Sequence, residues 1–325
     1  MKLKGTIRPT TVFDHGMNPG LISHLAKIGL RNAYQYINAS SSHDIPLTHE
    51  SLSNIAEKSN LLAIHVAELD TQKLKKNIPF KTNTFYNTWS GAGMIAEGID
   101  PIQVGHSKKH LITEYNFRTI DDLIGKKGYP ASSNLKYYPI RGVDRSTNTL
   151  VLSDKGEEIL SEGFLIPHGE ANTLSKYLST ETYTPDVYYV YHPSDVTIRS
   201  IDILKKRKYH QQKYIHSVLD QTQLYHRGYD SVGAYLIFGE EVPFGWWIGT
   251  VLSVSDVKKM GLKYAGPTEV QVAISYLSCI KWMLENPREG ICSPEDLPSE
   301  YILELCMPYL GKFYSRPTIK TPEIF

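Results

Sequence analysis

The sequence predicts an α/β fold, in which a mixed β-sheet is flanked by helices. Amphipathic patterns near the start and a long helical pattern over residues 268–285 alternate with runs rich in β-branched and aromatic residues. The longest runs, 232–238 and 244–254, are expected to form adjacent antiparallel strands joined through residues 239–243. A chain of 325 residues can form one large domain or two ordinary ones.

The first elements alternate as an α/β layer arrangement requires. A helix is predicted over residues 20–38, with Asn18 as its N-cap and Pro19 at its first position. A second amphipathic stretch follows Thr48 and ends near residue 60. The largely apolar run 61–67 then predicts a buried strand.

The remaining elements are shorter. Residues 90–97 predict a turn at Gly91 and Gly93 that leads into a helix, with Gly98 as its C-cap. Thr268 is expected to cap the long helix over residues 268–285. A last helix is predicted over residues 299–306, and further strands over residues 84–89, 137–141, 149–153, 163–167 and 187–191.

No segment matches the strand, Gly-x-Gly-x-x-Gly turn and helix of a dinucleotide-binding unit. Gly91 and Gly93 come closest, after a predicted strand, but Glu97 stands near where the third glycine should be. The sequence therefore predicts no recognisable nucleotide fold of its own.

Composition excludes several functional classes. The 35 basic and 34 acidic residues are mixed along the chain, so nucleic acid is not an expected partner. No apolar run is long enough to span a membrane and no signal peptide is recognisable, which predicts a cytoplasmic protein. Cys279, Cys292 and Cys306 are widely spaced, and no cluster of His, Cys and carboxylates has metal-ligand spacing.

Residues 15–20, His-Gly-Met-Asn-Pro-Gly, resemble the His-Gly-Ala-Asn-Pro-Gly motif of bacterial homospermidine synthases, in the saccharopine dehydrogenase-like superfamily. Further motifs resemble that family in the same order, over residues 11–311. They are Glu68-Leu69-Asp70-Thr71-Gln72, Asn87-Thr88-Trp89-Ser90, Glu97-Gly98, Gly163-Phe164-Leu165 with His168 and Glu170, Tyr191-His192-Pro193, Glu285-Asn286-Pro287 and Pro308-Tyr309-Leu310-Gly311. Several matches in fixed order are stronger evidence than any one of them.

The resemblance implies the fold of the saccharopine dehydrogenase-like C-terminal catalytic and dimerisation domain over residues 1–325. It implies a homodimer, and a C-terminal helical segment, residues 262–325, that packs on a Rossmann domain. Family members carry that NAD-binding domain before the motif that begins here at His15. Three explanations stay open: a fragment, a split gene with a separate NAD-binding Rossmann subunit, and an inactive relative.

The implied reaction is an NAD-dependent condensation of putrescine, or of spermidine plus putrescine, to homospermidine, with release of ammonia or diaminopropane. Such substrates are slender cations, which carboxylates and aromatic faces bind. By resemblance, Glu68, Trp89, Glu97 and His168 are the catalytic residues. Histidine is the side chain suited to exchanging protons near neutral pH.

The resemblance also implies binding roles. Asn18, Glu68, Trp89, Glu97 and Glu170 are expected to bind substrate. In residues 18–20, Asn18, Pro19 and Gly20 are expected to contact NAD, because a helix N-terminus presents free N–H groups to a phosphate or amide. Since Pro167 and Gly169 flank His168, a solvated turn is the alternative for that histidine.

The sequence leaves two other functions open. One is a saccharopine or carboxynorspermidine dehydrogenase-like oxidoreductase, which would need arginines for substrate carboxylates. The candidate segments contain Glu68, Glu97 and Glu170 and no arginine, which favours a plain polyamine. The other is a non-catalytic remnant that only binds polyamines or a partner subunit.

Overall fold

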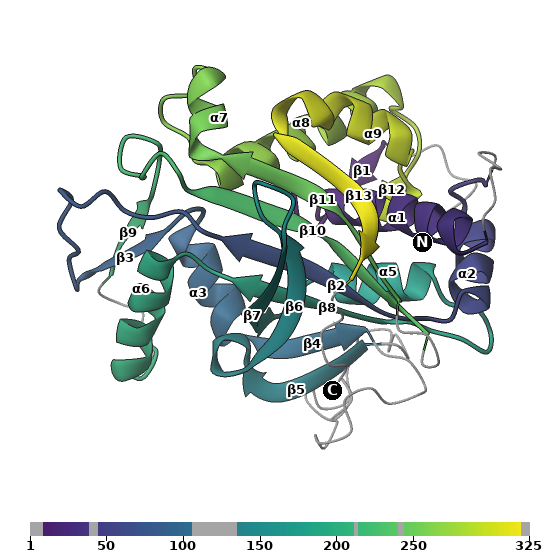
Figure 1. The fold of residues 1–325 in the computed structure, drawn as a ribbon, viewed down its shortest axis with the longest axis horizontal. Helices are drawn as coiled ribbons and strands as arrows, with labels where there is room; N and C mark the ends of the chain where they lie inside the picture. Colours follow the sequence, from purple (N-terminus) through teal and green to yellow (C-terminus); the bar gives the residue numbers. More distant parts are fainter. Residues whose placement is uncertain (1–8, 39–44, 106–134, 211–213, 240–243, 320–325) are drawn as a thin grey trace.

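The structure is a computed structural model, and it describes residues 9–38, 45–105, 135–210, 214–239 and 244–319. A nine-stranded mixed sheet forms its centre, in the order β13-β11-β10-β2-β8-β4-β5, with β7 paired to β8 and β6 paired to β7 (Figure 1). The strands are β2 (Leu61–Asp70), β4 (Pro101–Gly105), β5 (Leu135–Arg141), β6 (Ser146–Leu152), β7 (Glu158–Ile166), β8 (Asp186–His192), β10 (Tyr229–Phe238), β11 (Phe244–Ser253) and β13 (Lys312–Thr318). The predicted mixed α/β fold is confirmed.

Only β2 and β8 pair in parallel within this sheet, and the other pairs are antiparallel. The predicted pairing of β10 with β11 is confirmed, although residues 240–243 of their connection lie outside the described residues. Two small parallel pairs stand apart from the sheet. They are β1 (Thr11–Val12) with β12 (Ile291–Cys292), and β3 (Thr84–Asn87) with β9 (Ile215–Val218).

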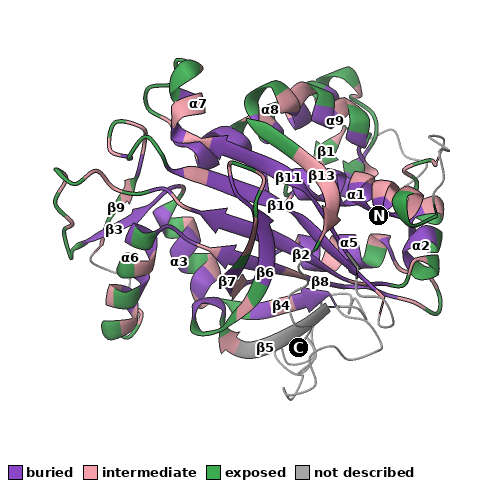
Figure 2. Cartoon of the chain, in the orientation of Figure 1, coloured by how far each residue is buried: buried purple, intermediate pink, exposed green. Residues whose placement is uncertain are grey.

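Helices cover one face of the sheet and the β6–β7 hairpin covers part of the other (Figures 1 and 2). On the helical face, α1 packs against β10 and β11, and α8 and α9 pack beside it. The helices are α1 (Leu21–Ile37), α2 (His49–Lys58), α3 (Gly91–Ile99), α5 (Glu170–Tyr177), α6 (Asp195–Lys206), α7 (Val254–Lys259), α8 (Pro267–Glu285) and α9 (Ser299–Cys306).

Strand β2 serves both cores because its side chains alternate between the two faces. Ile64 and Val66 belong to the large core beneath α1, whereas Ala63 and Ala67 belong to the smaller core beneath the hairpin. At the carboxyl end of β2 the helical face changes from apolar to acidic. The next side chains of that face, Glu68 and Asp70, are still buried.

Three predicted helix caps are wrong. Gly20, not Asn18, is the N-cap of α1, and Pro19 lies before the helix. Helix α3 continues past Gly98 and ends at Ile99. Gly266 is the N-cap of α8, since the Glu269 carboxylate accepts a hydrogen bond from the Gly266 N–H.

Several elements were not predicted, among them α5, α6, α7 and the edge strand β13. Strand β13 lies within the segment 262–325, which also contains α8 and α9. Helix α5 begins directly after Gly169, where the sequence left a solvated turn open.

The turn before α1 requires glycine at position 20. Gly20 has φ +134°, and a Cβ there would lie 2.5 Å from the Gly16 carbonyl oxygen and 2.7 Å from the Gly16 nitrogen. The same turn is closed by hydrogen bonds from Gly16 N to Pro19 O and from Leu21 N to Gly16 O. Backbone atoms leave no room for a side chain.

We predict that Gly20→Ala lowers the free energy of unfolding by about 3 kcal/mol, because left-handed strain and a backbone collision add together. Gly261→Ala is the matched control, since Gly261 also has positive φ, +79°, but nothing lies within 4 Å of its Cβ position. This control should lose only about 1 kcal/mol. Urea denaturation measures both, and equal losses would contradict the collision.

Candidate active site

Three carboxyl groups are buried together where β2 and β10 pair. Glu68 and Asp70 are two residues apart on β2, so they share one face, and Asp230 on β10 lies directly opposite Asp70. None of the three is more than 3% exposed. Between described residues, no lysine or arginine forms an ion pair with any of them.

Glu68 stands at the centre of this acidic cluster, which we define as Glu68, Asp70 and Asp230. Its Oε2 accepts hydrogen bonds from Asn18 Nδ2 at 2.8 Å and from the Tyr189 hydroxyl at 2.7 Å. Burial raises the pKa of Glu68, and the two donors oppose that rise. A cation placed beside Glu68 would therefore favour loss of the proton from its carboxyl group.

Asp70 and Asp230 each accept a hydrogen bond from a threonine hydroxyl. Asp70 accepts from the Thr88 hydroxyl at 2.6 Å, and Asp230 accepts from the Thr268 hydroxyl, which in turn accepts from Gln72 Nε2 at 2.9 Å. Burial raises the pKa of Asp70 to about 7. Burial, then the charges of Glu68 and Asp70, raises the pKa of Asp230 well above its ordinary value.

Aromatic rings line the same space. The Trp89 indole donates through Nε1 to the Tyr191 hydroxyl at 3.2 Å, and Tyr191 stacks on Tyr189 with centroids 5.7 Å apart. Both tyrosines lie on β8, next to β2 in the sheet. The site therefore pairs carboxylates with the ring faces that attract cations.

The His168 ring lies next to the Tyr189 ring, with the two centroids 4.8 Å apart. It is buried, so the solvated turn that the sequence left open is wrong. Glu170 Oε2 lies 3.6 Å from His168 Nδ1. At this distance the two atoms form no hydrogen bond, and Glu170 would pair with His168 when the imidazole is protonated.

The other oxygen of Glu170 is used by α1. Its Oε1 accepts hydrogen bonds from Gly20 N at 2.8 Å, Ser23 N at 3.2 Å and Ser23 Oγ at 3.1 Å. The N–H groups of Leu21 and Ile22 donate to Gly16 and Met17. The free N–H groups on which the expected NAD contact of residues 18–20 relied are thus occupied.

The half-buried side chains Asn18, Trp89 and Glu97 form the accessible side of the site, above the fully buried cluster. Burial raises the pKa of Glu97, and the nearby His168 opposes that rise. Five residues named from the sequence therefore lie in or next to one buried acidic and aromatic site: Asn18, Glu68, Trp89, Glu97 and His168. The Glu170 carboxylate and the Gly20 N–H are bonded to each other.

Four residues of the site were missed: Asp70, Tyr189, Tyr191 and Asp230. Asp70 carried a usable signal, because a residue two positions beyond Glu68 on a strand points to the same side. Asp230 carried none, since only the register of β10 against β2 brings it to Asp70.

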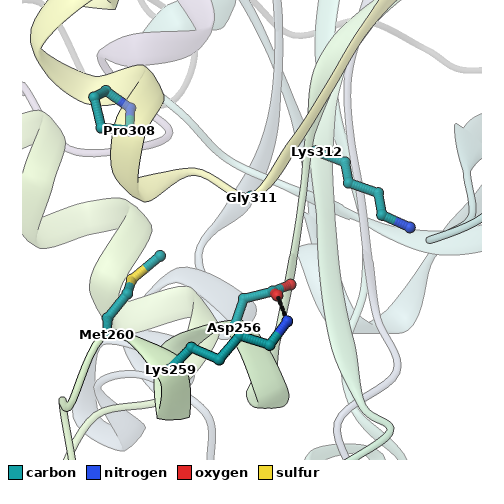
Figure 3. A pocket seen from close by; sticks show the side chains of 6 residues that line it. All are labelled: Asp256, Lys259, Met260, Pro308, Gly311 and Lys312. Atoms are coloured by element: carbon teal, nitrogen blue, oxygen red, sulfur yellow. Dashed lines mark hydrogen bonds and ion pairs between the residues drawn. The ribbon is translucent and has the colours of Figure 1, made fainter.

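A surface depression of about 410 Å³ lies elsewhere, between α7 and the start of β13 (Figure 3). Asp256, Lys259, Met260, Pro308, Gly311 and Lys312 line it. Lys259 is paired with Asp256 at 3.0 Å, so this depression offers no charge pattern comparable with the acidic cluster.

Among the described residues, no group of three or more His, Cys, Asp or Glu side chains is placed to hold a metal ion. Nor is any helix in this part of the chain both long and apolar enough to cross a membrane.

The fold and the site define a mixed α/β domain with a buried site of carboxylates and aromatic rings. No family model matches the chain. Relatives named homospermidine synthase, from Mesorhizobium japonicum and Blastochloris viridis, are 30% and 28% identical to it over 319 residues, 96% of this chain and 62% of each relative.

A crystal structure of the homospermidine synthase from Legionella pneumophila in complex with NAD has the same fold, with a TM-score of 0.84 and 27% identity. The match covers 98% of this chain and 66% of that one. The chain is a homologue of the homospermidine synthases, as its motifs predicted, and it spans 62% of the length of the curated relatives.

The raised pKa of Asp230 makes stability depend on pH. The folded state keeps this proton at pH values where the unfolded chain has lost it, so the free energy of unfolding falls as pH rises above about 4. We predict that Asp230→Asn reduces the difference in unfolding free energy between pH 4 and pH 8, because the amide has no proton to lose over this range.

Thermal and urea unfolding at the two pH values measure this effect. Asp195→Asn is the control, because the Asp195 side chain on α6 is 66% exposed and should leave the difference as in the wild type. An unchanged difference in Asp230→Asn would show that Asp230 is ionised in the folded protein across this range.

Proposed function

We propose that this chain is the substrate-binding and catalytic portion of an NAD-using homospermidine synthase that condenses putrescine, or spermidine plus putrescine, into homospermidine. The observation that carries the proposal is the acidic cluster, buried beside Trp89 without a cationic side chain from the described residues. A buried carboxylate requires a compensating charge or a proton. The ammonium group of a polyamine supplies that charge.

The site favours a polyamine over an amino-acid substrate. A saccharopine-type substrate carries carboxylates, for which arginine is the usual partner. The carboxyls of Glu68, Glu97, Asp70 and Asp230, protonated or ionised, give such a substrate no positive charge to pair with. The oxidoreductase alternative is therefore disfavoured by charge.

Each site residue then has a role that its position supports. Glu68 holds the far ammonium of the diamine, and Glu97 with the Trp89 face holds the reacting amine. A cation on a tryptophan face contributes about 0.5 to 2 kcal/mol, and a charged hydrogen bond about 1.5 to 3 kcal/mol. His168, which Glu170 would pair with in its protonated form, moves protons when ammonia leaves and a second amine adds.

Bound NAD would supply the hydride transfer that the reaction needs, first as acceptor and then as donor. The start of α1 offers no free N–H groups to a dinucleotide, because they are occupied by Glu170 and by turn carbonyls. We propose that NAD is held by a Rossmann unit outside these 325 residues, on the same polypeptide or on a separate subunit. Asn18 is the residue of the 18–20 turn that still faces the site.

The outer face of α8 is the proposed contact for that unit. Val272, Tyr276, Leu277 and Leu284 are all exposed on it, Leu284 by 76%. Exposed apolar patches of this kind mark interaction surfaces. This supports the expectation that the segment 262–325 packs on a Rossmann domain, and a cytoplasmic homodimer remains part of the same proposal.

We predict that Glu68→Gln weakens putrescine binding about 10- to 100-fold, because the neutral amide loses the charge but still accepts from Asn18 and Tyr189. Isothermal titration calorimetry with putrescine measures the change. Glu300→Gln, on the surface of α9 with its side chain 60% exposed, is the matched control and should bind as the wild type does.

Mass spectrometry of the same samples with NAD separates the remaining alternatives. Homospermidine formation would support a catalytic unit, whereas putrescine binding without product would favour a substrate-binding portion or remnant. If the wild type does not bind putrescine with or without NAD, the polyamine function is wrong for this chain.

A further inference from the structure

The turn of residues 15–20 contains His15 and Gly16, to which the proposed reaction assigns no role. This turn carries Asn18, whose amide donates to Glu68. Asn18 belongs to no helix or strand, so its position depends on what fixes the turn. Glu170 fixes the Gly20 end, through the N–H groups of Gly20 and Ser23.

A chain of hydrogen bonds fixes the other end. The Ser275 hydroxyl on α8 donates to the Gly16 carbonyl oxygen at 2.6 Å and lies 3.2 Å from His15 Nδ1. His15 Nε2 lies 3.1 Å from His24 Nε2, and His24 Nδ1 lies 3.0 Å from the Ser299 hydroxyl. These hydrogen bonds link α9, α1, the turn and α8.

The donors in this series of hydrogen bonds all point in one direction. A carbonyl oxygen only accepts, so the Ser275 proton goes to Gly16 and His15 Nδ1 must donate to Ser275. His15 Nε2 then accepts from His24 Nε2, and His24 Nδ1 accepts from Ser299. Burial lowers the pKa of His15 to about 4 and that of His24 well below its ordinary value, so both rings are neutral and keep this order at neutral pH.

We infer that Ser275 is a positioning residue: through Gly16 and His15 it holds the turn so that Asn18 donates to Glu68. The outer side of the same helix turn carries the exposed Tyr276 and Leu277. Helix α8 therefore joins the proposed docking face to the substrate site. The inference rests on the proposed function only for its substrate readout.

The test compares Ser275→Ala, Ser275→Thr and Ser278→Ala in the full chain. Ser278 is the matched control, because it is also buried on α8 but donates to the Ile274 carbonyl of its own helix and does not contact the turn. Ser275→Cys, which keeps the size of serine with a weaker donor, serves if the alanine variant does not fold.

The first readout is the pH titration of the Glu68 side-chain carboxyl by ¹³C NMR without ligand. The groups that face Glu68 and influence this titration are Asn18, Asp70, Glu97, His168, Tyr189, Tyr191 and Asp230. Only Asn18 lies on the turn that Ser275 holds. Loss of its hydrogen bond moves the Glu68 titration to higher pH.

We expect this upward shift in Ser275→Ala and in Asn18→Ala, with putrescine binding about 10-fold weaker in both. Ser275→Thr and Ser278→Ala should titrate and bind as the wild type does. A folded Ser275→Ala with the wild-type Glu68 titration would overturn the inference. A shift in a protein that does not bind putrescine would support the inference and reject the proposed function.

Discussion

The burial of three carboxyl groups at the end of one strand pair is the constraint on which the rest of this structure depends. Isolated carboxylates in a protein interior are strongly unfavourable, so they hold protons or recruit partners. Here Asp70 and Asp230 receive hydroxyl donors from Thr88 and Thr268, and Glu68 receives donors from Asn18 and Tyr189. The segments that carry these donors are the walls of the site.

This arrangement explains the order of the sheet around the site. Strand β2 lies between β8, which supplies the tyrosines, and β10, which supplies Asp230. The helices close the same end: α1 through the turn that presents Asn18, and α8 through Thr268 and Ser275. A cation that enters past Trp89 and Glu97 thus meets aromatic rings and buried carboxyl groups whose loss of protons it favours.

The fold was largely predictable, because periodicity and β-branched runs report which faces are buried. The strands β10 and β11 and the helices α2 and α9 show this. The caps were not predictable, since Asn18 and Thr268 are favourable cap residues whose side chains are drawn instead to Glu68 and Asp230. Motifs named most of the site, but Asp230 depends on cross-strand register, which no local pattern reports.

The number of protons released when putrescine binds tests directly whether the acidic cluster is protonated until it meets an ammonium group. It is measured by isothermal titration calorimetry at pH 7 in buffers of different ionisation enthalpy. The account predicts net proton release, because an ammonium group beside the acidic cluster favours the ionised form of carboxyls whose pKa values are raised. Binding without proton release, or with proton uptake, would show that these carboxyls are already ionised and would contradict the account.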